Sequence, residues 1–449
     1  NKLQSYDRPR GMHPEAGLLY QPIPFEEFQG LTHERNSSED RLALLNSSIN
    51  YDGKKVLDLG CANGFFLFSL IRSEKGISQG LGVDHFTGNV MIGNIISQLY
   101  GYDEQLDFTH GKLSIDFLQS LFEEGSWDVC HLLSVHHHLI RDLGIDETKK
   151  IFKTLHENVE TVAIEQGMIT DEEFENWTDN GNEFASGSFA RMLEMMESCG
   201  VPKENCFPIG IGMYLSGDRD DNEGWKRVMV GFTSSENFQT IDEVIERNHS
   251  NGILMELIMT GKPGDGEVWK HAVSGGSHAE RELRALRILK EEKGFPRIAD
   301  SEFTEYECSK GLIRLQRLEL RKIEIKDIEK TGKIIRKQAV DILMSMASNG
   351  IIHNEINTIH LLMSGSGNLV LIDFETSFFV WENRQEWMET VWAPNPSIGV
   401  GAYNRDVHQT SKWNTVDIES IDNIFREWKL PELSIKEKER YLTLLSKNR

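Results

Sequence analysis

Residues 56–66 read VLDLGCANGFF, and this stretch decides the fold. An apolar-biased run leads into a tight turn of small residues, and an apolar stretch over 65–71 follows. A strand, a turn and a helix in this order are typical of the nucleotide-binding unit of an α/β sheet. We expect Gly60 and Gly64 to remove the Cβ atoms that would hold a ligand away from the backbone. The first N–H groups of the helix would then point at that ligand.

The turn excludes two common phosphate-binding motifs. It has neither the G-x-G-x-x-G pattern of dinucleotide-binding proteins nor the Gly-Lys-Ser/Thr ending of a P-loop. The carboxylate of Asp58 suits a cationic or amine-bearing ligand better than a pyrophosphate. Residues 80–84 read GLGVD and predict a second strand that ends in Asp84. An acid at that point can accept hydrogen bonds from both hydroxyls of a ribose.

The composition bounds the class of protein. At 449 residues the chain is too long for one compact core, so we expect two or three domains. A net charge of −23 without a basic run argues against nucleic acid as a partner. The five cysteines form no C-x-x-C pair, as expected of reduced thiols in the cytoplasm. No apolar run reaches the roughly 18 residues of a membrane span, which leaves peripheral association open.

The first 236 residues divide into two parts. Residues 1–50 lack periodicity and form a leader, which is either loop or a lid over the ligand. From 51 to 236 candidate strands alternate with helical stretches, which predicts a parallel sheet covered on both faces. The expected strands are 56–59, 80–83, 107–110, 127–133 and 161–165. Residues 212–215 and 228–232 flank the polar residues 217–224 and predict a terminal hairpin.

A polar stretch over 234–250 predicts the boundary to a second, α+β domain over 251–419. The elements expected there are strands at 253–260 and 267–273, a helix at 279–292, a strand at 311–318 and a long helix at 328–349. The first two strands surround the residues GKPGDG, which are a strong hairpin signal. The last segment, 420–449, is helical and charged, and we expect it to be a solvated face or an interaction segment.

The glycine-rich turn, the strand that ends in Asp84 and the terminal hairpin together resemble class I S-adenosylmethionine-dependent methyltransferases, whose domain is Rossmann-like. The resemblance implies S-adenosylmethionine as the cofactor, with Asp84 at its ribose and residues 111–114 beside its adenine. Asp58 and the turn at 60–64 would hold its amino-acid end. A Rossmann-like turn that binds no such cofactor is the alternative.

Residues 132–139 read LLSVHHHL and follow the fourth expected strand, where the methyl acceptor would lie. Three adjacent histidines point in different directions on a strand or a helix, which argues against a three-ligand metal site. One of them could take a proton from a hydroxyl acceptor or donate a hydrogen bond to a phosphate, and we favour His137. A purely structural role is the alternative. The Asn/Asp-Pro-Pro-Tyr/Phe motif of amino-group methylation is absent here, which favours an oxygen acceptor.

Two stretches of the second domain carry another resemblance. Residues 351–355 read IIHNE and residues 369–375 read LVLIDFE. They resemble the catalytic loop and the metal-binding loop of a protein-kinase-like fold, the second in the Asp-Phe-Glu form of small-molecule kinases such as choline kinases. The resemblance implies a site for ATP and Mg²⁺, with Asp373 as a metal ligand. It also implies four nucleotide-binding residues, namely the strand lysine Lys270, its helical ion-pair partner Glu282, and Gln316 and Leu318 in the hinge.

Two positions depart from the kinase-like pattern. Glu355 stands where that family has its catalytic aspartate and is one methylene longer, and misplacing a base by about 1 Å can cost roughly 100-fold in rate. His360 stands where the family has a metal-binding asparagine, and magnesium prefers oxygen ligands. Two hypotheses therefore remain. The domain is either a kinase or a pseudokinase that binds a nucleotide or a partner and serves as a regulatory or docking scaffold.

A methyltransferase followed by a kinase-like domain resembles the bacterial bifunctional kinase/methyltransferases that terminate polymannose O-antigen chains. The likeness runs from about residue 20 to residue 375. It implies O-methylation of a glycan hydroxyl or a terminal sugar phosphate, and it leaves homo-oligomerisation open. It also implies that Arg41 in the leader reaches the methionine carboxylate of the donor. By this resemblance eight residues would border the methyl donor: Tyr20, Gln21, Arg41, Asn63, Asp84, Leu113, Ser114 and Leu133.

Overall fold

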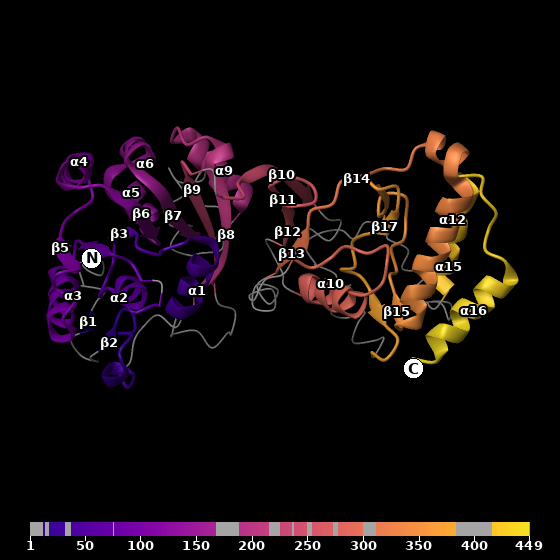
Figure 1. Cartoon of the computed structure of the whole chain (residues 1–449), viewed down its shortest axis with the longest axis horizontal. Coiled ribbons are helices and arrows are strands. Elements are labelled where there is room, and N and C mark those ends of the chain that lie inside the picture. Colours follow the sequence, from indigo (N-terminus) through magenta and orange to yellow (C-terminus); the bar gives the residue numbers. More distant parts are fainter. Residues whose placement is uncertain are drawn as a thin grey trace, which may run out of the picture. The chain divides into compact units, whose positions relative to one another are not determined.

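The chain forms two compact units, Asn1–Asp242 and Glu243–Arg449, in the computed structural model (Figure 1). The structure describes residues 12–13, 18–31, 37–74, 76–167, 188–214, 225–235, 238–248, 254–272, 277–299, 311–382 and 415–448. The polar turn expected at 217–224 lies outside the described residues. Among the described residues, every helix is too short or too polar to cross a lipid bilayer.

A seven-stranded sheet with the order β5-β4-β3-β6-β7-β9-β8 forms the centre of the first unit. Its parallel strands are β3 (Lys55–Leu59), β4 (Gln79–Asp84), β5 (Leu106–His110), β6 (Trp127–Leu133) and β7 (Val159–Gly167). Two antiparallel strands, β9 (Trp225–Thr233) and β8 (Cys206–Tyr214), complete the sheet beside β7. The predicted mixed α/β fold with a parallel sheet is confirmed.

Helices cover both faces of this sheet. They are α1 (Ser38–Ser48), α2 (Phe65–Ile71), α3 (Thr87–Tyr100), α4 (Ile115–Glu124), α5 (His136–Leu143), α6 (Ile145–Asn158) and α9 (Phe189–Ser198). Figure 1 shows α1, α2 and α3 on one face and α4, α5, α6 and α9 on the other. A short leader with β1 (Met12–His13), β2 (Leu18–Leu19) and the 3-10 helix Glu26–Phe28 precedes α1. Because both faces are covered, the central strand β3 is buried along almost its whole length.

The second unit begins with a four-stranded sheet of order β10-β11-β12-β13. Its elements are β10 (Ile241–Asn248), β11 (Leu254–Thr260), β12 (Glu267–Ala272) and β13 (Leu312–Gln316), with helix α10 (Ser277–Ile288) between the last two strands. Strand β10 lies within the stretch 234–250 that the sequence presents as a polar boundary, and its first residue, Ile241, is buried. This polar stretch therefore contains a strand that the sequence did not predict.

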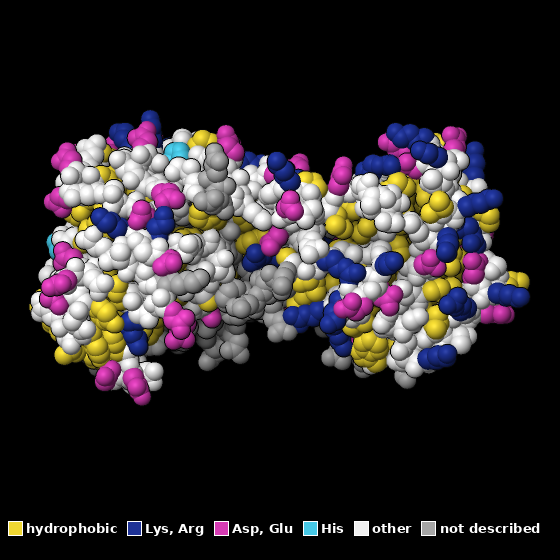
Figure 2. All heavy atoms as spheres, viewed as in Figure 1, with side chains coloured by type: hydrophobic (Ala, Val, Ile, Leu, Met, Phe, Trp, Pro, Cys, Tyr) yellow, Lys and Arg dark blue, Asp and Glu magenta, His cyan; other side chains and the backbone are white. Residues whose placement is uncertain are grey.

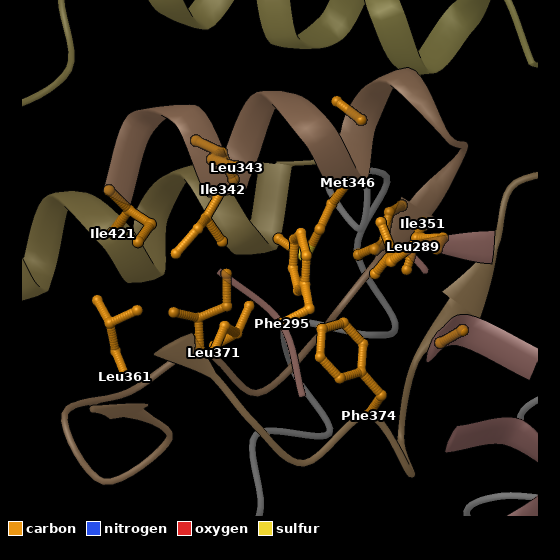
Figure 3. Close-up of a cluster of buried hydrophobic side chains, with 14 of the residues drawn as sticks. Leu289, Phe295, Ile342, Leu343, Met346, Ile351, Leu361, Leu371, Phe374 and Ile421 are labelled. Carbon is orange, nitrogen blue, oxygen red and sulfur yellow. The ribbon is translucent and has the colours of Figure 1, made fainter. Parts of the chain in front are cut away.

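The rest of the second unit is mostly helical. Its elements are α12 (Ile325–Ser348), α15 (Val416–Glu427), α16 (Ile435–Ser446), a sheet of β14 (Leu320–Arg321), β16 (Leu361–Ser364) and β17 (Leu369–Leu371), and a pair of β15 (Ile351–Ile352) with β18 (Phe378–Phe379). Figure 3 shows its core, where Ile342 and Leu343 of α12 lie beside Ile421 of α15 and Leu371 of β17.

Residues 420–449 are helical, as predicted, but they are more than a solvated face or an interaction segment, because one side of each helix belongs to the core. Ile421 and Phe425 of α15 and Tyr441 of α16 are at most 1% exposed and belong to the same core cluster as α12. Apolar residues three or four positions apart place one face of each helix inward, while the charged residues occupy the other face. The high charge of the segment describes only that outer face.

The two units differ strongly in charge. The first contains 39 of the 71 acidic residues but only 19 of the 48 Lys and Arg residues, so it carries most of the net charge. On the face that Figure 2 shows, Lys and Arg side chains are denser over the second unit than over the first. Any cluster of basic side chains in the first unit therefore lies against an acidic background.

Candidate functional site

A cavity of about 460 Å³ lies in the first unit at the carboxyl ends of β3, β4 and β6. This volume is within the usual range for small-ligand sites, and the carboxyl ends of parallel strands are the usual place for them. Its walls are formed by the loops after these three strands and after β5, by residues of α1, α3 and α5, and by residues 20–21 of the leader. The described part of the chain thus forms a concave site where the sequence predicts one.

Asp84 ends β4 and lines this cavity. Its Oδ2 accepts a hydrogen bond from the backbone N–H of Ala62 at 2.9 Å, and its Oδ1 accepts one from the N–H of Phe86 at 2.8 Å. The two bonds fix the carboxylate between the loops after β3 and β4. Because each carboxylate oxygen has a second acceptor position, Asp84 can still accept hydrogen bonds from a ligand.

The two glycines of the turn are required by the protein itself. Gly60 and Gly64 have φ values of +84° and +87°, which L side chains rarely adopt. A Cβ on Gly60 would lie 2.4 Å from Val135 Cγ2, and one on Gly64 would lie 2.6 Å from Phe108 Cε1. Backbone conformation and internal packing explain both glycines, and Gly64 is not among the residues that line the cavity.

Asn63 fastens the leader to the turn. Its Oδ1 accepts a hydrogen bond from Gln21 N–H at 3.1 Å, and its Nδ2 donates to the Gln21 carbonyl at 3.1 Å and to the Pro22 carbonyl at 3.3 Å. Tyr20 and Gln21 are thereby held against the cavity, while Asn63 itself does not line it. The side-chain Oε1 of Gln21 is buried without a hydrogen-bond partner among the described residues.

A buried polar network forms one wall of the cavity. Arg41 Nη2 donates to Glu165 Oε2 at 2.7 Å, and the Ser134 hydroxyl donates to the same oxygen. Arg227 Nη1 donates to Ser134 Oγ at 2.8 Å. Arg41, Glu165 and Arg227 are all at most 2% exposed. Glu165 and Arg227 were not predicted from the sequence, although a charged residue inside an apolar strand is a signal that could have identified both.

Asp58 lies in β3 below the turn and does not line the cavity. It is 2% exposed, and its Oδ2 has no hydrogen-bond partner among the described residues. Burial raises the pKa of Asp58 to about 7, although the nearby Arg41 charge opposes this rise. A role at the amino-acid end of a ligand stays a prediction for this residue.

The three histidines open helix α5. His136 and His137 are buried, and burial lowers the pKa of His136 to about 3. His138 lines the cavity, as do Arg141 and Asp142 one turn later. Consecutive helical residues are separated by about 100°, so only one of the three rings can face the ligand side. The sequence favours His137, but the structure places His138 at the cavity.

The predicted cofactor residues divide into two groups. Those that line the cavity are Tyr20, Gln21, Arg41, Gly60, Asp84, Leu113 and Leu133, and those that do not are Asp58, Asn63, Gly64 and Ser114. Ser114 instead caps helix α4, where its hydroxyl accepts a hydrogen bond from Phe117 N–H at 3.2 Å. The second group thus includes residues with clear local structural roles.

Lys270 of β12 is the centre of a charged cluster in the second unit. Its Nζ lies 2.7 Å from Glu282 Oε2 and 3.3 Å from Glu375 Oε2, and it also contacts Asp373 Oδ1. Burial opposes its charge, but the carboxylates of Asp373, Glu282 and Glu375 raise the pKa of Lys270 well above its usual value. The pKa of Asp373 lies well below its usual range because the Lys270 charge outweighs burial.

Glu355 and His360 lie beside this cluster. His360 Nε2 is 3.2 Å from Asp373 Oδ2, and His360 Nδ1 is 2.8 Å from the backbone oxygen of Glu355. The Glu355 carboxylate accepts a hydrogen bond from the Thr376 hydroxyl at 3.3 Å. Burial and the Asp373 charge raise the pKa of Glu355. Gln316 is exposed at the end of β13, with Leu318 half-buried after it.

Asp417, at the start of α15, holds the 351–355 loop in place. Its carboxylate accepts hydrogen bonds from the backbone N–H groups of His353 and Asn354, both at 2.8 Å. Burial raises the pKa of Asp417 to about 6, and the two N–H groups oppose this. Asp417 was not predicted from the sequence, because it lies some sixty residues beyond the loop that it supports.

The chain is similar to known proteins over part of its length. No family model matches the chain. Over 110 residues it is 34% identical to the O-antigen chain terminator bifunctional methyltransferase/kinase WbdD of Escherichia coli. These residues are 24% of this chain and 15% of that protein. A 2.2 Å crystal structure of WbdD covers 97% of this chain and 92% of its own, at 18% identity and a TM-score of 0.42.

A second solved structure matches about half of the chain. The N-terminal domain of EvdMO1, solved in the presence of SAH and D-fucose, covers 47% of this chain and 90% of its own, at 13% identity and a TM-score of 0.31. The 110 residues that match WbdD are a small part of that protein. Within that stretch, the predicted resemblance of this chain to the bifunctional methyltransferase/kinase is confirmed.

Proposed function

We propose that this chain is an S-adenosylmethionine-dependent O-methyltransferase fused to a kinase-like domain. The observation that carries the proposal is Asp84, whose carboxylate is fixed by two backbone N–H groups at the edge of a 460 Å³ cavity. An acid at the end of the second strand of such a sheet is the residue that a ribose requires. The sequence similarity to a protein named as a methyltransferase/kinase supports the same reading.

The residues of the cavity fit this cofactor. Asp84 would accept the ribose hydroxyls, and Leu113 would form an apolar wall beside the adenine. Gln21 Oε1, a buried acceptor without a partner among the described residues, suits the ammonium group of the methionine end. Arg41 would bind its carboxylate. When bound, the cofactor supplies an electrophilic methyl group.

We propose an oxygen of a glycan hydroxyl or a terminal sugar phosphate as the methyl acceptor. Lys112 and Arg141 line the cavity together with His138, although the unit as a whole is strongly acidic. Basic side chains at this place would attract an anionic acceptor against that background. His138 would take the proton of a hydroxyl acceptor or donate a hydrogen bond to a phosphate oxygen.

For the second unit we propose a kinase-like nucleotide site. Lys270, held by its ion-pair partner Glu282, would bind the α/β-phosphates, while Asp373 would bind a metal ion and Glu355 would stand as the base. The alternative is a pseudokinase that serves as a regulatory or docking scaffold. The contact of Lys270 with three carboxylates favours this alternative, because the phosphates of a nucleotide must displace part of that cluster.

The test uses the intact chain with a methyl donor labelled in its methyl group. Matched glycans with and without a terminal phosphate are offered, each in the presence and absence of ATP. Transfer to a pre-phosphorylated glycan without ATP would support the methyltransferase. Transfer to the unphosphorylated glycan only with ATP would support an active kinase as well. Absence of transfer together with absence of S-adenosylmethionine binding by calorimetry would overturn the proposal.

A further inference from the structure

An acidic residue lies among the basic side chains of the cavity in the first unit. Asp142 of α5 lines this cavity together with Lys112, His138 and Arg141. Arg141 and Asp142 follow His138 by three and four positions, so the three residues share one face of the helix. A carboxylate at this place lowers the affinity of the cavity for a bare anion, because like charges repel each other. Binding of an anion alone therefore does not explain Asp142.

A contribution to stability does not explain this acid either. Arg141 Nε donates a hydrogen bond to Asp142 Oδ1 at 2.6 Å, and the two side chains are 38% and 37% exposed. An ion pair with this exposure contributes little to the stability of a fold. Among the described residues no donor contacts the other carboxylate oxygen, Oδ2. One oxygen of Asp142 thus keeps its acceptor positions for a ligand.

Asp142 is ionised at neutral pH. The hydrogen bond from Arg141 lowers the pKa of Asp142, although burial opposes this, and the charges of the basic side chains around it lower the same pKa further. An ionised carboxylate only accepts hydrogen bonds, so its ligand must donate one. Lys112, on the loop after β5, acts on Asp142 through its charge, but the described side chains of the two residues form no ion pair. The ammonium and the carboxylate therefore stand apart on the wall of the cavity.

The chemistry of these groups fits one class of ligand. Lys112 and Arg141 supply positive charge for an anionic group, and Asp142 supplies an acceptor for a hydroxyl beside that group. A sugar that carries a phosphate next to a free hydroxyl offers both groups on one ring. A phosphate without such a hydroxyl offers only the anion, which the charge of Asp142 opposes.

We propose that Asp142 is a specificity-determining residue, which accepts a hydrogen bond from a sugar hydroxyl beside the phosphate that Lys112 and Arg141 bind. The cavity thereby prefers sugar phosphates with a free neighbouring hydroxyl to phosphates without one. A site that accepts a hydrogen bond from a substrate hydroxyl rejects the analogue that lacks it. The inference deepens the acceptor site proposed above and rests on that proposal for the presence of a sugar acceptor.

The experiment measures binding to the intact chain by calorimetry, with and without S-adenosylhomocysteine. The ligands are a hexose phosphate with a free hydroxyl on the neighbouring carbon, its analogue without that hydroxyl, and inorganic phosphate. Asp142→Ala should lower the affinity for the hexose phosphate by about tenfold or more, because a hydrogen bond to a charged group is lost. The same change should leave the affinity for the other two ligands equal or slightly higher, because a negative charge beside the anion is removed.

Controls separate recognition of the hydroxyl from a structural role. Asp142→Asn keeps a neutral acceptor and should lie between Asp142→Ala and the unmodified chain in its affinity for the hexose phosphate. Asp146→Ala removes an exposed acid that does not line the cavity and should leave all three affinities unchanged. Thermal unfolding shows whether each variant is folded. Equal losses for the three ligands in Asp142→Ala would mean that Asp142 only holds Arg141 in place, and would overturn the inference.

Binding of S-adenosylmethionine separates this inference from the proposed function. Its affinity should be the same in Asp142→Ala and in the unmodified chain, whereas a loss in the variant would place Asp142 at the cofactor and overturn the inference. A chain that binds S-adenosylmethionine but none of the three phosphates would also overturn it, and would leave the methyltransferase in place. Discrimination through Asp142 without any binding of S-adenosylmethionine would support the inference and remove the methyltransferase.

Discussion

The cavity of the first unit and the charged cluster of the second share one feature of the backbone. Ala62 and Ser134 at the cavity, and Asn354 and Asp373 at the cluster, have φ values from 49° to 77°. Residues other than glycine rarely adopt this conformation, and such strain gathers at functional sites. Among the described residues one further case, Lys429, lies elsewhere. Both sites are therefore held in shape by the surrounding structure.

The two sites differ in how their charges are used. In the cavity, Asp84 is fixed by backbone N–H groups and keeps acceptor positions for a ligand. In the cluster, Lys270 contacts three carboxylates, so a ligand must first separate charges that already stabilise one another. The first arrangement favours direct binding. The second makes nucleotide binding depend on displacing part of the carboxylate cluster around Lys270.

The largest effect is expected from the buried pair in the wall of the cavity. Arg41→Ala leaves Glu165 buried without this partner, and removing one member of a buried pair typically costs about 3–5 kcal/mol of stability. Denaturant unfolding should show a lower midpoint for the first unit. Arg191→Ala removes an ion pair of the same 2.7 Å length whose side chains are about half exposed, and it should change stability little. Equal stability of the two variants would contradict the structural role of Arg41.

The second prediction concerns pH and the first unit. The folded-state pKa of Asp58, about 7, is above its ordinary value of 3.8, so the folded protein binds this proton more tightly. The contribution is fully present below about pH 4 and is lost as the pH rises through 7, up to about 4 kcal/mol in all. Stability profiles of Asp58→Asn and of the unmodified protein should therefore diverge over this window. Asp52→Asn, at an exposed position, should show no such divergence.

The third prediction tests whether the cluster of the second unit can be made to resemble an active kinase. Glu355→Asp together with His360→Asn should raise phosphotransfer with Mg²⁺, or create it, by up to about 100-fold, because about 1 Å of base placement is worth that much. Nucleotide affinity should change little, since Lys270 and Glu282 are retained. ATP turnover with sugar acceptors measures the rate, and thermal shifts with Mg-ATP measure binding. Robust turnover by the unmodified chain, lowered by the double change, would show an active kinase with its own geometry.

The sequence predicted the strands of the first unit better than the long-range contacts of either site. Strand β6 matches its expected bounds, and β3, β4 and β5 differ from theirs by one or two residues, because a sheet buried on both faces requires continuous apolar runs. Asp84 was predicted because it ends such a strand, whereas Lys270 was predicted from the resemblance to a kinase-like fold. Glu165 and Asp417 were missed because they act on residues over thirty or sixty positions away. Which of the three histidines faces the cavity depends on where α5 begins, and element boundaries are the least predictable feature.

The fourth prediction addresses the ribose acceptor of the cavity. Asp84→Ala removes the carboxylate that would bind the ligand, and each charge-assisted hydrogen bond is worth about 1.5–3 kcal/mol. Calorimetry with S-adenosylmethionine should show a loss of about tenfold to a few hundredfold in affinity. Asp103→Ala, at an exposed position before β5, should bind as tightly as the unmodified chain. Unchanged affinity in Asp84→Ala would remove the assignment of this carboxylate.

The smallest effect is expected from Asn63, which touches the leader rather than the cavity. Its side chain makes three hydrogen bonds to the backbone of Gln21 and Pro22, so it positions Tyr20 and Gln21 against the ligand. Neutral hydrogen bonds contribute about 0.5–1.5 kcal/mol each. When the leader detaches, the freed backbone groups can form hydrogen bonds with water, which limits the loss. Asn63→Ala should therefore lower the affinity for S-adenosylmethionine by roughly tenfold, as measured by calorimetry.

Asn63→Asp sharpens this test, because it keeps the acceptor for Gln21 N–H but loses the donor to the two carbonyl groups. Its affinity should lie below that of Asn63→Ala, because the buried carboxylate would face the Gln21 and Pro22 carbonyl oxygens. Hydrogen exchange at Gln21 should rise in the same order, since the leader opens locally before the rest of the unit unfolds. Affinity that falls without faster exchange at Gln21 would mean that Asn63 acts on the turn alone, and the leader would then not be a lid.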